Sequence, residues 1–293
     1  MNRRGFLQAM STLALAGAAR PQLSFAADSA ARFQVGCYTR PWDQQDYRTA
    51  LDGIAEAGYK YAGIMTAKGK SWVMITPQTT PEESAQIGEE VRKRGLQTLS
   101  VYGDFSPAES LEQGLKALRR LIENCHACGS PNLLLGGTTD GQLVKRYYQT
   151  VTECCPFAAT LNVSITIKPH GGQNATGPQC RKIIEEVNHP AFGLWYDPGN
   201  IFYYSDGKLD PVDDCATVDG LVRGMSVKDF RPPKEVLVTP GSGQVQFQKI
   251  LARLRQGGFV KGPLIVECVA RGNLAQVTAE ARKARLFVEQ LIA

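Results

Sequence analysis

The sequence is poor in histidine, in concentrated charge and in nucleotide-binding glycine motifs. Its 293 residues include three histidines, too few for a metal cluster built from several of them. The net charge of +5 is spread along the chain without a basic block, which argues against nucleic acid or an anionic membrane as a partner. No G-x-G-x-x-G pattern follows the first apolar run, so a dinucleotide-binding fold has no support.

Residues 1–27 have the features of an export signal. The stretch NRRGFLQ at 2–8 closely resembles the twin-arginine export motif. The apolar stretch that follows is too short to span a bilayer as a stable helix, and Ser24 and Ala26 are the small residues that a signal peptidase reads. We therefore expect passage through the twin-arginine export machinery, cleavage after Ala26, no stable membrane span after cleavage, and a periplasmic or secreted mature protein.

Eight cysteines in an exported protein permit disulfides. Cys125 and Cys128 form a C-x-x-C pair, but no second pair stands at zinc-site spacing. Cys154 and Cys155 are adjacent, and neighbouring cysteines rarely bridge each other without strain. A redox role for the C-x-x-C pair would need exposure and a lowered pKa. We expect buried thiols for most of the eight.

Short apolar runs alternate with helical patterns after the export signal. The stretch 107–127 repeats leucine and isoleucine at helical spacing, which predicts a helix with one face on a core. The expected strands are residues 33–38, 61–65, 97–102, 132–135, 163–167, 192–196, 222–227 and 264–267, and the expected helices include 81–94, 107–127 and 142–161.

Apolar strands that alternate with helices predict a parallel sheet covered on both sides. Eight expected strands favour closure of the sheet into a barrel over an open sheet. Residues 28–293 contain no linker or low-complexity stretch, so we predict one domain of the α/β class, a single (β/α)8 TIM barrel. In such a barrel, functional residues stand at the C-terminal ends of the strands.

Ionisable residues gather at the ends of the later strands. Lys168, Asp197 and Glu267 each end an apolar run. A buried charge in such a position is costly unless it is paired or bound to a metal. We therefore expect these three side chains to converge on one site.

Motifs in fixed order accompany these charges: KPHGG at 168–172, DPGN at 197–200, SVKD at 226–229, PGSGQVQF at 240–247, and Glu267. Together they resemble the xylose isomerase-like barrel superfamily, which includes sugar and sugar-phosphate isomerases and epimerases. That superfamily often has Glu-Asn-His-Gly, Asp-x-Gly-Asn or Asp-x-Gly-His, His-x-Lys-Asp, Gly-x-Gly-x-(Val/Ile)-Asp-Phe and a final glutamate at the matching places.

The resemblance implies a divalent cation held by Glu, Asp, His and Glu, which correspond here to Lys168, Asp197, Ser226 and Glu267. Two of the four ligands are therefore missing, and one has become a cation. We favour a metal-free site in which Lys168 neutralises both carboxylates, because a charged lysine works against metal affinity. The alternative keeps a divalent metal (Mn, Zn, Co or Mg) held by Asp197, Glu267 and His170.

The candidate catalytic residues are Glu267, His170 and Lys168. His170 precedes two glycines that allow close backbone approach, and it is a candidate general acid or base, or a partner of a sugar hydroxyl. Without a metal, Lys168 would stabilise an oxyanion, and Glu267 or His170 would move the proton. With a metal, Glu267 would serve as both ligand and base.

The candidate substrate-binding residues carry structural alternatives. Lys228 and Asp229 are either a buried ion pair or substrate contacts. The side chain of Asn200 either orients the nearby aspartate or caps the next helix. Tyr38 and Tyr102 are candidate walls for a sugar face, with core packing as the alternative.

The resemblance implies a carbohydrate-active isomerase or epimerase that abstracts a proton next to a sugar carbonyl. This reaction needs a base, an acid and a group that stabilises the enediolate. β-Elimination from a keto-glycoside begins with the same step, so a lyase is one alternative. The alternative from another class is a non-catalytic carbohydrate-binding barrel. Export fits an oligosaccharide or keto-glycoside better than a sugar phosphate, and the sequence has no phosphate-binding signature.

Overall fold

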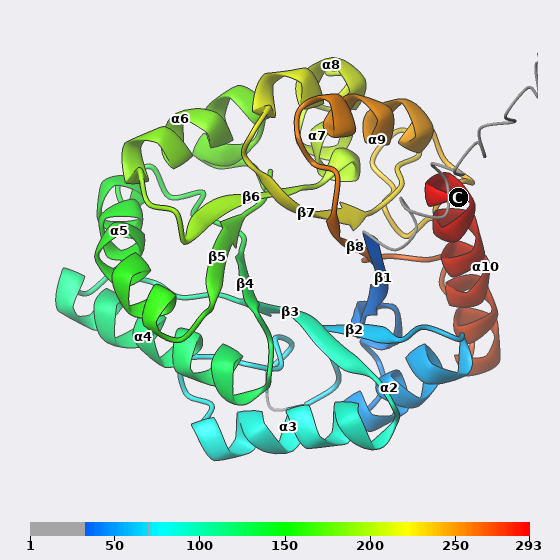
Figure 1. Ribbon diagram of the computed structural model, residues 1–293, viewed down its shortest axis with the longest axis horizontal. Helices are drawn as coiled ribbons and strands as arrows, with labels where there is room; N and C mark the ends of the chain where they lie inside the picture. The colour runs from blue at the N-terminus through cyan, green and yellow to red at the C-terminus, as the bar shows by residue number, and fades with distance from the viewer. Residues whose placement is uncertain (1–32, 70) are drawn as a thin grey trace, which may run out of the picture.

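The protein is a closed barrel of parallel strands surrounded by helices (Figure 1). The computed structural model describes residues 33–69 and 71–293, and the expected export signal at 1–27 lies outside them. Neighbouring strands pair in chain order, and the last strand closes on the first in the register Phe33 to Gly262. The strands are β1 (Phe33–Tyr38), β2 (Tyr61–Ile64), β3 (Gln97–Gly103), β4 (Asn132–Leu135), β5 (Ser164–Ile167), β6 (Phe192–Tyr196), β7 (Val222–Val227) and β8 (Gly262–Val266).

Helices and short 3-10 turns connect the strands. The predicted helix at 107–127 begins later, at Leu111, because the Ser110 side chain accepts a hydrogen bond from the backbone of Gln113 and so caps the helix there. The helices are α2 (Tyr47–Glu56), α3 (Pro81–Lys93), α4 (Leu111–Ala127), α5 (Val144–Thr160), α6 (Gly177–Val187), α7 (Pro198–Tyr204), α8 (Pro211–Cys215), α9 (Phe247–Gln256) and α10 (Leu274–Ile292), with the 3-10 turns η1 (Arg40–Trp42), η2 (Gly172–Asn174) and η3 (Ala216–Val218).

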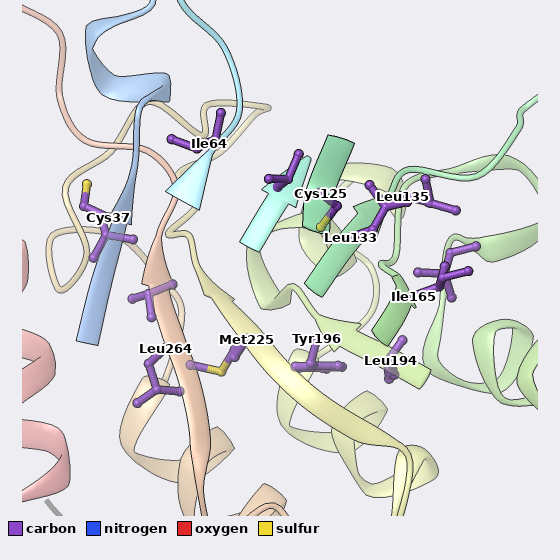
Figure 2. Close-up of a cluster of buried hydrophobic side chains, with 14 of the residues drawn as sticks. Cys37, Ile64, Cys125, Leu133, Leu135, Ile165, Leu194, Tyr196, Met225 and Leu264 are labelled. Carbon is purple, nitrogen blue, oxygen red and sulfur yellow. The ribbon is translucent and has the colours of Figure 1, made fainter. Parts of the chain in front are cut away.

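Alternation along the strands separates two hydrophobic regions. Side chains such as Leu133, Ile165 and Leu264 pack between the sheet and the helices, in the large cluster of Figure 2. The residues between them on the strands face the inside of the barrel. A smaller cluster fills that interior: Tyr38, Met65, Leu99, Leu134, Trp195 and Ile265.

All eight cysteines are free and buried. Burial raises the pKa of the Cys128 thiol to about 12 and raises the pKa of Cys125 as well. The C-x-x-C pair thus has neither the exposure nor the lowered pKa that redox chemistry requires, and the expectation of buried thiols is confirmed. Within the described part of the chain, no helix has the length and apolar character needed to cross a membrane.

Candidate active site

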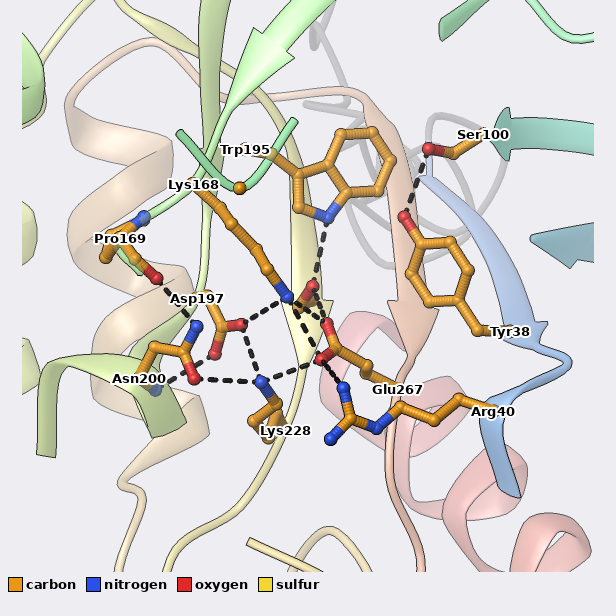
Figure 3. Close-up of polar contacts among 12 residues, drawn as sticks. Tyr38, Arg40, Ser100, Lys168, Pro169, Trp195, Asp197, Asn200, Lys228 and Glu267 are labelled. Carbon is orange, nitrogen blue, oxygen red and sulfur yellow. Dashed lines mark hydrogen bonds and ion pairs between the residues drawn. The ribbon is translucent and has the colours of Figure 1, made fainter. Parts of the chain in front are cut away.

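Because side chains alternate along the strands, several charged side chains at the strand ends point into the barrel. On β8, Leu264 and Val266 pack against the helices while Ile265 faces the interior, so the next residue in phase is Glu267. The same phase brings Lys168 after β5 and Asp197 after β6 to the interior. The structure therefore brings together the three side chains that were expected to converge (Figure 3).

Glu267 stands at the centre of this charged cluster. It is completely buried, and Lys168 Nζ donates to both of its oxygens at 3.0 and 2.8 Å. Lys228 Nζ lies 2.7 Å and an Arg40 nitrogen 3.3 Å from Oε1, and the Ser226 hydroxyl donates to Oε2 at 2.7 Å. Both oxygens of the carboxylate are thus engaged by donors.

Asp197 joins the two lysines from the other side. Its Oδ2 atom accepts from Lys168 Nζ at 3.3 Å and from Lys228 Nζ at 3.1 Å. Its Oδ1 atom accepts from the backbone N–H of Asn200, which makes Asp197 the N-cap of α7. Asp197 therefore pairs with the two lysines through one oxygen and caps α7 through the other.

The Asn200 side chain does not cap α7, which was one of its two expected roles. Its amide nitrogen donates to the Pro169 carbonyl at 2.6 Å, and its Oδ1 accepts from Lys228 Nζ at 2.8 Å. Asn200 thereby fixes the Lys228 ammonium against Asp197. It acts on the cluster through that lysine.

The cluster holds three cations against two carboxylates. Lys168 and Lys228 each reach three acceptor atoms, which matches the three N–H donors of an ammonium group. Burial opposes the charge of Glu267, yet Lys168, Lys228 and Arg40 hold its pKa well below the usual range. Burial lowers the pKa of Lys168, whereas Asp197 and Glu267 outweigh burial and raise the pKa of Lys228.

These residues do not fit a divalent cation. The Lys168 ammonium lies within hydrogen-bond distance of both Asp197 and Glu267, in the place from which a metal would have to bind them. The Ser226 hydroxyl is likewise turned to Glu267 as a donor. In the part of the chain that the structure describes, no three His, Cys, Asp or Glu side chains come together as a metal-binding group. The alternative set of Asp197, Glu267 and His170 is therefore not assembled.

His170 lies at the rim of the cluster and is partly exposed. Burial, followed by the charges of Lys168 and Lys228, lowers its pKa to about 3, so the ring is neutral at physiological pH. Its ring centre lies 5.4 Å from that of Tyr204. A Cβ atom on Gly136 would lie 3.1 Å from His170 Nδ1 and 2.8 Å from the Tyr102 hydroxyl, so glycine at this position lets both groups approach.

The two tyrosines expected to contact substrate occupy different places. Tyr102 is partly exposed, and Lys168 Nζ lies 5.7 Å from the centre of its ring. Burial, followed by Asp104 and Glu267, raises the pKa of Tyr102, so its hydroxyl stays protonated. Tyr38 is completely buried in the barrel interior and donates to Ser100 at 3.0 Å. Tyr38 therefore has the core-packing role and offers no wall to a ligand.

Asp229 faces away from the cluster, one residue out of phase with Lys228. Its oxygens accept four backbone N–H groups, from Phe230, Gly241, Gly243 and Val245, at 2.8–3.0 Å. The carboxylate thus organises the loop at 240–245. Of the two alternatives for Lys228 and Asp229, the ion pair with each other is not formed, because Lys228 pairs with Asp197 and Glu267.

Sequence reasoning missed Arg40, Ser226 as a donor, and the role of Trp195. Arg40 stands two residues after Tyr38 in the same phase, which is the signal that could have placed it in the barrel. Trp195 is buried, and its indole N–H donates to Ser226 at 3.2 Å, which in turn donates to Glu267. These two hydrogen bonds hold one carboxylate oxygen of Glu267 in place.

The family of the chain follows from these features and from comparison with known proteins. A profile of the xylose isomerase-like TIM barrel family matches residues 51–290, and the chain belongs to that family. No sequence among the curated proteins matches it.

Solved structures with the same fold include a xylose isomerase domain protein from Planctomyces limnophilus, with a TM-score of 0.68, 17% identity and coverage of 89% of this chain and 97% of that one. A D-allulose 3-epimerase from Methylomonas sp. in complex with D-allulose has a TM-score of 0.69 at 17% identity, covering 88% and 97%. An L-ribulose 3-epimerase has a TM-score of 0.67 at 13% identity, covering 88% and 94%. At these identities the likeness concerns the fold.

Proposed function

We propose that this protein is a sugar isomerase or epimerase that works through a lysine-based cluster in place of a divalent metal. The observation that carries the proposal is the contact of Lys168 with both Asp197 and Glu267. Three cations against two carboxylates leave one fixed positive charge in the cluster, and such a charge stabilises an oxyanion without reorganising when the charge develops. The family and the epimerase structures of the same fold supply the substrate class, a carbohydrate with a carbonyl group.

His170 is the group best placed to move the proton. The oxygens of Glu267 are all engaged by donors, whereas the His170 ring is neutral and partly exposed. In the proposed step, a C–H bond next to the carbonyl breaks, its proton goes to the imidazole and its electron pair forms the enediolate. Burial and then the charges of Lys168 and Lys228 lower the pKa of the ring, and the developing anion favours its protonated form. Return of the proton from the imidazole to the neighbouring carbon, with the hydroxyl proton moving from one enediolate oxygen to the other, gives isomerisation. Protonation of the original carbon from the opposite face, by water at the partly exposed rim, gives epimerisation.

Tyr102 supplies the neutral donor at the same rim. Its protonated hydroxyl and His170 Nδ1 both approach Gly136, so the two groups act on one region of space. A neutral hydroxyl that donates to the carbonyl oxygen favours the enediolate form of the substrate. In this proposal the charged cluster supplies the electrostatic field, and His170 and Tyr102 at its rim carry out the proton transfers.

Hydrogen exchange tests this function directly. The purified protein is incubated in D2O with D-allulose, L-ribulose, D-fructose and D-glucuronate, and deuterium at the carbon next to the carbonyl is followed by NMR. We expect incorporation with at least one sugar, and its loss in His170→Asn. His126→Asn is the matched control, because His126 is exposed and its ring hydrogen-bonds to the Leu161 carbonyl, away from the cluster. Binding of these sugars without incorporation would overturn the proposal.

A carbohydrate-binding barrel is the second candidate, and one observation favours it. Both carboxylates in the cluster already have their oxygens occupied, so neither is free to accept a proton. The same exchange experiment separates the two functions, since a binder takes up sugar and leaves every C–H bond intact. Release of an aglycone from a keto-glycoside, with deuterium incorporated, would instead assign the lyase.

We also infer that the protein is exported by the twin-arginine route to the periplasm or beyond. The support is the NRRGFLQ stretch at 2–8 followed by an apolar run and small residues before position 27. Cell fractionation of the full chain beside an Arg3→Lys/Arg4→Lys variant tests it. We expect the variant to remain in the cytoplasm, and an unchanged distribution would contradict the inference.

A further inference from the structure

Arg40 is a cation with unused hydrogen-bonding capacity at the rim of the charged cluster. Turn η1 places it directly after β1, and one of its nitrogens lies 3.3 Å from Glu267. Its side chain is 23% exposed, whereas Glu267 is fully buried. Within the described residues, Glu267 is the one hydrogen-bond acceptor that the guanidinium reaches. Four of its five N–H donors are therefore open to another partner.

The charge of Arg40 is also surplus to the cluster. Lys168 and Lys228 already pair with Asp197 and Glu267, so these four groups balance among themselves. Asp43 is the next acidic neighbour, but its carboxylate is taken by Arg271 at 3.2 and 3.4 Å. The partly exposed guanidinium is thus the site's net positive charge.

An aromatic side chain stands beside this cation. The Arg40 guanidinium carbon lies 5.5 Å from the centre of the Trp72 ring, and Trp72 is 52% exposed. The segment after β2 that carries Trp72 is held by backbone bonds between Ala67 and Trp72 and between Met65 and Met74. The half-exposed indole therefore presents a positioned apolar surface next to the guanidinium.

We infer that Arg40 and Trp72 form a subsite for the carboxylate of a sugar acid, such as a uronic acid. A guanidinium matches a carboxylate through two parallel N–H bonds, and the neighbouring indole packs against the apolar face of the sugar. The inference rests on the proposed function for its choice of a carbohydrate. A carboxylate suits the subsite better than a phosphate, because one guanidinium alone offers few donors for a dianion and the sequence has no phosphate-binding signature.

Binding measurements test the subsite independently of turnover. Titration calorimetry of the full protein compares D-glucuronate, D-glucose and glucose 6-phosphate. The part of the tryptophan fluorescence change that is lost in Trp72→Phe follows the same ligands at Trp72. We expect D-glucuronate to bind about tenfold or more tightly than D-glucose. This preference should vanish in Arg40→Gln and shrink in Arg40→Lys, which keeps the charge and loses the fork. Arg120→Gln, an exposed change on α4, is the matched control.

The outcomes separate this inference from the proposed function. Trp72→Ala should weaken D-glucuronate and D-glucose alike, and its circular dichroism melt shows whether the variant folds. Equal affinity for acid and neutral sugar, or an acid preference that survives Arg40→Gln, would overturn the inference. Tighter, Arg40-dependent binding of glucose 6-phosphate would overturn it in favour of a phosphate site. Acid binding without hydrogen exchange would leave the subsite standing and reject the enzyme.

Discussion

The Nζ atom of Lys168 lies 2.8 and 3.0 Å from the two carboxylate oxygens of Glu267, and both side chains are almost wholly buried. The same ammonium reaches Asp197 at 3.3 Å. A lysine thus joins two carboxylates at strand ends where the family resemblance implied a metal. This contact explains how two buried acids are tolerated in the barrel, because a buried charge without a partner is strongly destabilising.

Loss of Lys168 should destabilise the fold through Glu267. Removal of one partner of a buried ion pair typically costs about 3–5 kcal/mol, and Lys228 still contacts Glu267 at 2.7 Å, so we expect Lys168→Met near the lower end of that range. Urea unfolding measures it, beside Lys116→Met on the exposed face of α4, which should change stability by less than about 0.5 kcal/mol. The double variant Lys168→Met/Glu267→Leu should lose less than the sum of its parts. Strict additivity would show that the two side chains do not interact.

His170 should make the protein less stable in acid. In the folded state, burial and then Lys168 and Lys228 lower its pKa to about 3, from about 6.5 in an unfolded chain. The unfolded chain therefore binds the proton more readily, so stability is fully present above about pH 6.5 and falls as pH drops towards 3. We therefore expect the free energy of unfolding to fall less between pH 7 and pH 5 in His170→Asn than in the unmodified protein, by about 1–2 kcal/mol.

Unfolding free energies at both pH values check this expectation, with His126→Asn as the control that keeps the full dependence. The activity of the unmodified protein should also show no ascending limb near pH 6.5, since the ring is already neutral there. Titration of the His170 ring near pH 6.5 in the folded protein, followed by NMR with His170→Asn to assign the signal, would contradict the lowered pKa.

Asp229 should act on the loop at 240–245 and leave the charged cluster intact. Asp229→Asn replaces an oxygen that accepts two backbone N–H groups with an amide that donates. An unsatisfied buried donor costs about 1–3 kcal/mol, and we expect a loss of that size together with faster amide hydrogen exchange at Gly241 and Gly243. Asp206→Asn, which removes a surface pair with Lys234, is the isosteric control. Normal exchange in the loop would rule out this role.

The sequence predicted the strands to within two residues and the convergence of the later strand ends. It succeeded there because apolar runs and helical spacing are local signals, and because parallel strands must end on one face. The charges of Lys168, Asp197 and Glu267 were visible as polar endings on apolar runs.

The roles that the sequence did not predict depend on which face of the sheet a side chain points to and on contacts across the barrel. Asp229 and Lys228 are adjacent in sequence and face opposite sides, which only a confirmed strand end reveals. Tyr38 is in phase with the interior, but its core-packing role depends on the interior cluster around it and on Ser100 from β3, which accepts its hydroxyl hydrogen bond. Arg40 was missed because it stands in a 3-10 turn beyond the strand, and its partner Glu267 is 227 positions away in sequence.

Metal content tests the central claim most directly. The purified protein and a Lys168→Glu variant are incubated with Mn²⁺, Zn²⁺, Co²⁺ and Mg²⁺ in turn, desalted, and measured by elemental mass spectrometry. If Lys168 stands in place of a cation, the unmodified protein retains far less than one metal per chain, and the folded variant gains one. Near-stoichiometric metal in the unmodified protein would contradict the account, because the lysine and the cation cannot occupy the same contacts with Asp197 and Glu267.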